Sequence, residues 1–169
     1  MPTETQVTAE EYRRMSFEGP DAEFVHGEIV ERTLPNLIHS RVQAQLVVVF
    51  AQGTGSPRVF PCPELRVQLG PDLFRVVDLA VFAGKLPKEL IPTQPQLVAI
   101  EIVSPDDRHT EVLEKLEEYR RWGVANVWLV DPWLKKLHTY TETGLIQVSE
   151  FTLHEYSLRI TTAHLLEGV

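Results

Sequence analysis

The stretch LVAIEIVSPDDRHTEVLEKLEEYRRWGVANVWLVDP, residues 97–132, decides the fold. Its first seven residues form an apolar run that predicts a buried strand, interrupted by a single carboxylate, Glu101. The Ser-Pro-Asp-Asp segment ends that strand, and Thr110 is placed to cap a helix that Gly123 ends. VANVWLVDP then predicts a second buried strand. A sheet with a helix packed on it is therefore the expected core.

The flanking sequence extends this unit with further strands and helices. The predicted elements are a helix from Thr8 to Met15, a hairpin turning at His26-Gly27, a helix from about Pro35 to Gln52, strands over 58–60, 65–69, 74–82, 135–141 and 146–153, and a short helix near Thr161 to Leu166. This order predicts an α/β (α+β) fold with a mixed central β-sheet flanked by helices. At 169 residues the chain is long enough for one substantial core, so a single domain over 1–169 is expected.

Composition and charge limit the classes of protein to which this chain can belong. The formal net charge of -8 argues against a surface coated with phosphate-binding lysines, which counts against non-specific nucleic-acid binding. Cys62 is the single cysteine, so an internal disulfide is excluded and a reducing compartment is favoured. The apolar runs are too short for a membrane span, and the first residues lack the apolar core of a signal peptide. We therefore expect a cytoplasmic location and no membrane partner.

Two strands that otherwise read as core each carry one carboxylate. Asp78 interrupts RVVDLAVF and Glu101 interrupts LVAIEIV. Such acids either face solvent on a half-exposed strand or need a positive neighbour, because an unpaired buried charge is costly. Lys115 lies at the border of the apolar face of the next helix, from which its ammonium can reach over the end of the strand. The alternative for Lys115 is an ordinary surface pair with Glu111, four residues earlier.

Together these residues resemble the Uma-two family of restriction-endonuclease-like proteins, in the PD-(D/E)XK nuclease superfamily. The resemblance covers most of the chain, and its joint pattern is more specific than any single piece. The matching pieces are EFVHGEIVE (23–31), His39, VVDLAVF (76–82), EIVSPDDR (101–108), EKLEEYRRWGVANVWLVDP (114–132) and the strand from Lys136 to Tyr140.

The resemblance implies roles for individual side chains. It makes Asp78 and Glu101 the metal-binding carboxylates and Lys115 the catalytic lysine, supplied from the helix because Val103 stands at the usual lysine position. It also implies that Glu23 adds a ligand or orients one through water. The side chains expected to line the same cavity are His39, Gln43 and Ser104. This chain departs from the family pattern at two positions, with Val77 before the first acid and Glu111 where aspartate is more frequent.

These residue types suit one chemistry best but leave others open. Oxygen ligands favour Mg²⁺ or Mn²⁺, so the first hypothesis is a metal-dependent endonuclease that hydrolyses phosphodiester bonds in DNA, with a homodimer as one way to cut both strands. A rim of arginines is available for a nucleic acid, namely Arg41, Arg66, Arg75, Arg108, Arg120 and Arg121. The second hypothesis is a nuclease fold kept as a binding or assembly module. The third is a metal-dependent hydrolase of another phosphate ester.

Overall fold

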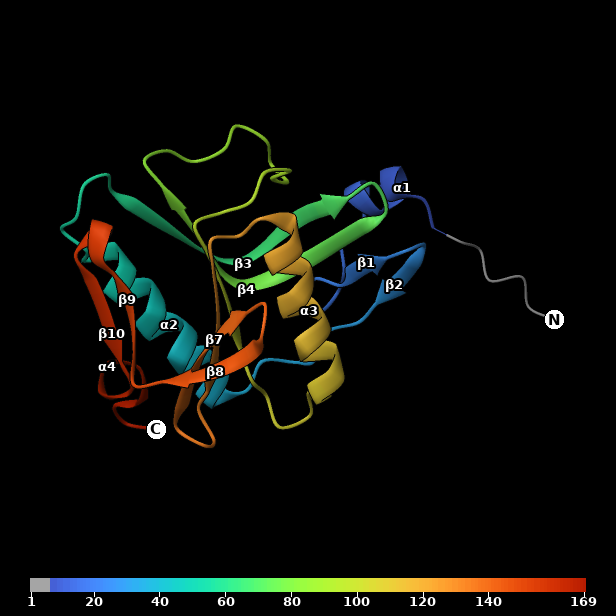
Figure 1. The fold of residues 1–169 in the computed structure, drawn as a ribbon. Coiled ribbons are helices and arrows are strands. Elements are labelled where there is room, and N and C mark those ends of the chain that lie inside the picture. The colour runs from blue at the N-terminus through green and yellow to red at the C-terminus, as the bar shows by residue number, and fades with distance from the viewer. Residues whose placement is uncertain (1–6) are drawn as a thin grey trace.

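The computed structural model describes residues 7–169, which build a central mixed sheet with helices on both faces (Figure 1). The elements in chain order are α1 (Ala9–Arg14), β1 (Glu23–Val25), β2 (Glu28–Val30), α2 (Leu37–Ala51), β3 (Val59–Gly70), β4 (Leu73–Ala83), β5 (Val98–Ile102), α3 (His109–Trp122), β6 (Asn126–Asp131), β7 (Lys136–Thr141), β8 (Gly144–Val148), β9 (Glu150–Leu153), the 3-10 helix η1 (His154–Tyr156), β10 (Leu158–Thr161) and α4 (Thr162–Leu166). The predicted α/β class is confirmed. No helix in this part of the chain is long and apolar enough to cross a membrane.

The large sheet has eight strands, in the order β2-β1-β4-β5-β6-β7-β8, with β3 paired to the other edge of β4. Only β5 and β6 run parallel, and α3 connects them. β9 and β10 form a separate two-stranded sheet. Along one edge, β4 pairs with β1 at Leu73 and Phe74 and with β5 from Leu79 to Val81. Residues 75–78 therefore have no strand partner on that edge.

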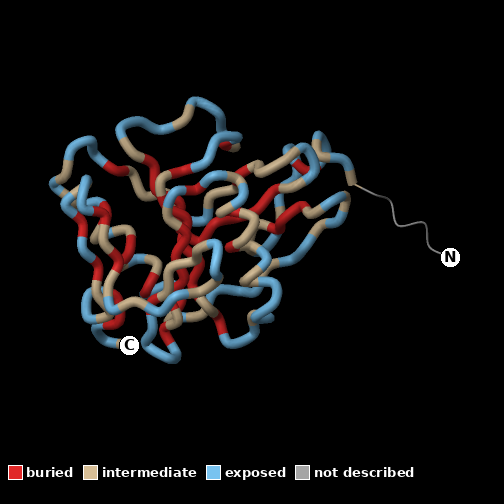
Figure 2. The backbone as a smooth tube through the Cα atoms, viewed as in Figure 1, coloured by how far each residue is buried: buried red, intermediate tan, exposed pale blue. Residues whose placement is uncertain are grey.

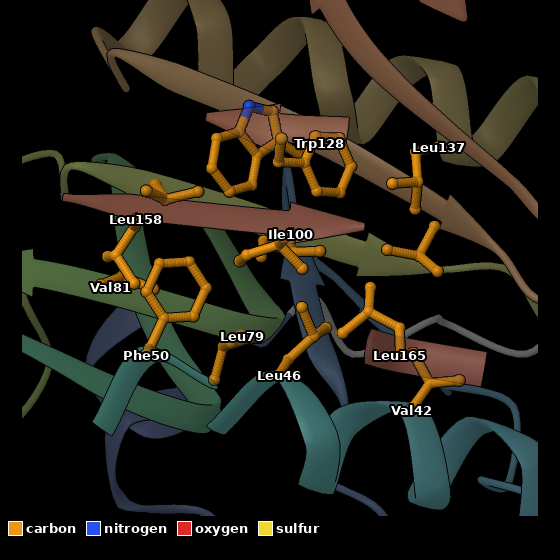
Figure 3. Close-up of a cluster of buried hydrophobic side chains, with 14 of the residues drawn as sticks. Val42, Leu46, Phe50, Leu79, Val81, Ile100, Trp128, Leu137, Leu158 and Leu165 are labelled. Carbon is orange, nitrogen blue, oxygen red and sulfur yellow. The ribbon is translucent and has the colours of Figure 1, made fainter. Parts of the chain in front are cut away.

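Apolar side chains fill the space on both faces of the sheet. Ile100 of β5 packs with Leu46 of α2 in the first cluster, which also holds residues of β9, β10 and α4 (Figure 3). There Trp128 stacks on Phe151, with ring centroids 4.3 Å apart and an interplanar angle of 2°, which joins the two sheets. On the opposite face, Ala99 packs in a second cluster with residues of α3. Burial is accordingly concentrated in the strands at the centre of the fold (Figure 2).

Several local predictions are confirmed. Thr8 caps α1 in a capping box with Glu11, and Gly27 takes a positive φ of 97° in the β1–β2 turn. Gly123 ends α3 in the left-handed conformation at φ 109°. The predicted cap at Thr110 is wrong, because α3 begins at His109 and its N-cap residue, Arg108, makes no side-chain capping hydrogen bond.

Three strand predictions need correction. The segments predicted at 58–60 and 65–69 form one strand, β3, that runs through Pro61 and Pro63. Prolines are tolerated there because β3 lies at an edge and needs no ladder donor on its outer side. The segment 146–153 is divided at Ser149 between β8 and β9, which belong to different sheets. β10 was not predicted.

Candidate active site

Asp78 and Glu101 lie on the neighbouring antiparallel strands β4 and β5. The ladder between these strands ends at the pair of Leu79 with Ile100, and just beyond it Asp78 accepts a hydrogen bond from the amide of Ile102, the residue after Glu101. Both side chains are buried, with only 4% of Asp78 and 7% of Glu101 exposed, which rules out the solvent-facing alternative. Like charges placed opposite each other destabilise a sheet. The negative charge at this point of the fold must therefore be neutralised, by cations or by protonation.

Lys115 of α3 supplies one of these cations. Its Nζ lies 2.9 Å from Glu101 Oε2 and 3.0 Å from Glu23 Oε1, and it donates to the Val76 carbonyl oxygen at 3.2 Å. The alternative surface pair with Glu111 does not form, because Glu111 pairs with Arg108 at 3.5 Å. The strand-to-helix connection thus brings the lysine back over the acid of β5, as the sequence predicts.

Glu23 joins the same cluster from β1. Its Oε1 also accepts a hydrogen bond from the Val76 amide at 3.0 Å, and its Oε2 lies 2.9 Å from Arg75 Nη1. Arg75 in turn makes a two-point contact with Glu118 of α3, at 2.6 and 2.8 Å. The Glu23 carboxylate is therefore held on both oxygens by protein donors.

The helix α2 brings two more of the predicted side chains to Asp78. His39 Nε2 lies 3.2 Å from Asp78 Oδ2, which also accepts from the Ile102 amide at 2.8 Å. Gln43 donates to the Asp78 main-chain carbonyl at 2.8 Å. Ser104 is buried and lines the same cavity, but its amide donates to Asp107 at 2.7 Å rather than to Glu23, Asp78 or Glu101.

Three contributors were not predicted from the sequence. Arg32, in the connection between β2 and α2, donates to Asp78 Oδ1 at 2.7 Å. Its other terminal nitrogen pairs with Glu64 of β3, which also accepts from Gln43 at 2.8 Å. Tyr119 donates its hydroxyl to Glu101 Oε1 at 2.8 Å. Tyr119 alone carried a signal, since it stands one turn after Lys115, but its aromatic ring suggested only packing.

The backbone at Glu64 is unusual. Glu64 has a φ of 50°, in the left-handed region, although it lies within a strand and is not glycine. The two pairs of the β3–β4 ladder on either side are Pro63 with Leu79 and Leu65 with Val77, so Glu64 stands across from Asp78. Such conformations are strained by about 1–3 kcal/mol and gather at functional sites. The result here is a third carboxylate directed at the Asp78 region.

Burial and charge shift the pKa values of the acids in opposite directions. Burial raises the pKa of Glu101 to about 7, with Lys115 opposing and the Asp78 charge adding to the rise. Burial also disfavours the ionised form of Asp78, but the hydrogen bond from His39 and the charges of Lys115 and Arg32 hold its pKa below the ordinary value. Asp78 is thus ionised at neutral pH, whereas Glu101 is protonated in a large fraction of the molecules.

The basic partners respond to the same charges. Burial opposes the charged forms of His39 and Lys115, yet their pKa values are raised, by Asp78 for His39 and by Glu101 and Glu23 for Lys115. For Glu23, Lys115 and Arg75 outweigh burial and lower the pKa. The acids and bases of the cluster therefore stabilise one another's charged forms.

A cavity of about 270 Å³ is lined by Glu23, His39, Asp78, Glu101, Ser104 and Lys115, but not by Gln43, which was predicted to line it. Its charged lining has eight acids and four permanent cations: Glu23, Glu31, Glu64, Asp78, Glu101, Asp107, Glu111 and Glu114, with Arg32, Arg75, Arg108 and Lys115. Of the arginines predicted as a rim, only Arg75 and Arg108 belong to this lining. An excess of carboxylates in a partly enclosed site draws cations and repels free phosphate.

The donor set fits a hard divalent cation. Two buried carboxylates on adjacent strands match the way Mg²⁺ is held in proteins, through one or two carboxylates with the remaining positions left to water and substrate oxygens. Within residues 7–169, no three His, Cys, Asp or Glu side chains gather as a complete metal site. The set suits an open site rather than a closed structural one.

The fold and the buried cluster define a restriction-endonuclease-like α/β protein. Its structure matches a crystal structure described as "a putative nuclease belonging to DUF820" from Anabaena variabilis, with a TM-score of 0.83 and 24% identity over 95% of this chain and 98% of that chain. A family model described as "Uma2: Putative restriction endonuclease" matches residues 9–166. The chain belongs to that family. No curated protein matches the sequence.

Proposed function

We propose that this protein is a metal-dependent endonuclease that hydrolyses phosphodiester bonds in DNA, with Asp78 and Glu101 holding Mg²⁺ or Mn²⁺. The observation that carries the proposal is the placement of two buried carboxylates on adjacent strands, one of them in contact with Lys115, in an acid-lined cavity. Membership of a family described as "Putative restriction endonuclease" supports the same class of reaction. A bound divalent cation would polarise the scissile phosphate and lower the pKa of an attacking water.

The chain's own residues would then position and neutralise the reacting groups. Lys115 would place a fixed positive charge beside the attacked phosphate, where negative charge develops. Its raised pKa keeps that charge at neutral pH. Glu23 would orient Lys115 through their 3.0 Å contact, and Tyr119 would fix the rotamer of Glu101 through its hydroxyl. His39 would hold Asp78 Oδ2, while Oδ1 accepts from Arg32.

The test is cleavage of plasmid and of short single- and double-stranded DNA with Mg²⁺ or Mn²⁺. We expect wild type to nick or cut DNA, and Asp78→Asn and Lys115→Ala to abolish cleavage. Arg159→Gln is the matched control, because Arg159 pairs with Glu150 on the separate two-stranded sheet. If the wild type and both site variants behave identically with both metals, the assignment is refuted. Cleavage of another phosphate ester but not of DNA would show that DNA is not the substrate and favour a hydrolase of that ester.

One observation favours a second candidate, a nuclease fold used as a binding or assembly module. Asp78, Glu101 and Glu23 each already have a cationic partner within the protein, as a purely structural ion-pair network would. Calorimetry with Mn²⁺ separates the two candidates. The endonuclease binds the ion in a manner that Asp78→Asn removes, whereas the module shows no such binding.

A further inference from the structure

The two oxygens of Asp78 have different surroundings. Oδ2 is engaged by the Ile102 amide at 2.8 Å and by His39 at 3.2 Å. Oδ1 is engaged by Arg32 Nη2 at 2.7 Å. Both Arg32 and Asp78 line the cavity, and the Arg32 side chain is only 13% exposed. A cation that approaches Asp78 from the cavity therefore meets a guanidinium already in place.

A second anchor holds Arg32 independently of Asp78. Its Nη1 pairs with Glu64, whose carboxylate is also fixed by Gln43 at 2.8 Å. Glu64 adopts the left-handed backbone described above, which directs its carboxylate to this position. Arg32 itself lies in residues 31–36, which form neither helix nor strand. Its guanidinium can consequently leave Asp78 and remain attached to Glu64.

We propose that Arg32 is a displaceable counterion, which occupies the divalent-cation position beside Asp78 and, once displaced, binds a phosphate oxygen of the substrate while Glu64 retains it. This inference rests on the proposed function and names a regulation of the same site. Guanidinium groups suit phosphate oxygens because their donors form a rigid planar fork. An acid-lined cavity would repel phosphate, so release of one arginine by the metal ties substrate binding to metal binding.

The first experiment measures Mn²⁺ binding by calorimetry for wild type, Arg32→Met and Arg159→Met. Removing a competitor that donates a charged hydrogen bond should tighten binding by about tenfold or more. Arg159→Met removes an equal charge from an arginine–glutamate pair on the separate sheet and should leave the affinity unchanged. Equal or weaker binding by a folded Arg32→Met protein overturns the proposal.

The second experiment uses wild type, so it does not depend on how well Arg32→Met folds. The guanidinium resonance of Arg32 is followed in protein labelled at its arginine side chains and assigned with Arg32→Lys. It should shift on addition of Mg²⁺, and shift again with inorganic phosphate only when Mg²⁺ is present. A resonance that ignores Mg²⁺, or that responds to phosphate equally without the metal, overturns the proposal.

The outcomes separate this inference from the proposed function. If wild type binds no Mn²⁺, both fail. If wild type binds Mn²⁺ and Asp78→Asn abolishes binding, but Arg32→Met binds as wild type does, the metal site stands and only the role of Arg32 is lost.

Discussion

Replacing Lys115 with methionine should destabilise the protein in a way that depends on pH. Methionine keeps most of the length of the side chain but removes the ammonium that contacts Glu101, Glu23 and the Val76 carbonyl oxygen. Removing one partner of a buried ion pair costs about 3–5 kcal/mol, because the other charge stays buried. Glu23 keeps Arg75, so most of this loss arises at Glu101.

The pH dependence follows from the pKa of Glu101. In wild type this pKa is raised from 4.5 to about 7, so the folded state binds more protons than the unfolded state between these two pH values, and the Glu101 contribution is constant above pH 7. Without Lys115 the folded pKa rises further, since that ammonium lowers it. The free energy of unfolding of the variant then continues to fall above pH 7, by up to about 1.4 kcal/mol for each pH unit. The difference between wild type and variant should widen from pH 7 to pH 9.

The assay is urea unfolding followed by circular dichroism, in EDTA, at pH 6, 7, 8 and 9. A second variant, Lys115→Met with Glu101→Gln, removes the titrating acid and should lose the widening with pH while recovering part of the stability. A difference below about 1 kcal/mol at pH 8, or one that stays constant from pH 7 to pH 9, refutes the reasoning. Urea unfolding of Lys115→Ala under the same conditions shows whether its loss of cleavage reflects chemistry or unfolding.

Two further predictions concern the scaffold. Phe151→Ala should lower the free energy of unfolding by about 3–5 kcal/mol in urea melts, because it removes a buried ring that stacks on Trp128. Leu90→Ala, at an exposed leucine, is the control, and equal losses for the two variants would contradict the packing argument. Gly55→Ala should lower the melting temperature strongly, because a Cβ there overlaps the Tyr156 carbonyl. Gly19→Ala is the control, since a Cβ at Gly19 meets no atom within 4 Å, and matching melting curves for the two variants would refute the close approach.

The sequence predicted those site residues that stand out from their immediate neighbours in the chain. Asp78 and Glu101 stood out because an acid within an apolar run needs an explanation, and Lys115 because its helix position directs it back to the strand. The structure brings these three together with Glu23, while their catalytic and metal-binding roles stay predictions. The overall class was predictable for the same reason, since apolar periodicity marks strands and helices along the whole chain.

The missed features depend on contacts between distant segments. Arg32 stands in an irregular connection, and its contact with Asp78 joins residues 46 positions apart. The left-handed φ of Glu64 has no residue signature, because the sequence offers glutamate rather than glycine or asparagine. The continuous β3 was likewise hidden by its two prolines, which are compatible with a strand only because that strand lies at an edge.

The unpaired stretch of β4 has a consequence for how this fold can change. Where a neighbouring strand would stand, side chains take over its role at Val76, whose amide donates to Glu23 and whose carbonyl accepts from Lys115. The cluster therefore satisfies the hydrogen-bonding groups of an unpaired part of β4, in addition to being a candidate active site. A relative with no catalytic activity would still need an acid and a base at these positions to satisfy the backbone of Val76. Glu23 and Lys115 therefore have a structural role whether or not they take part in catalysis.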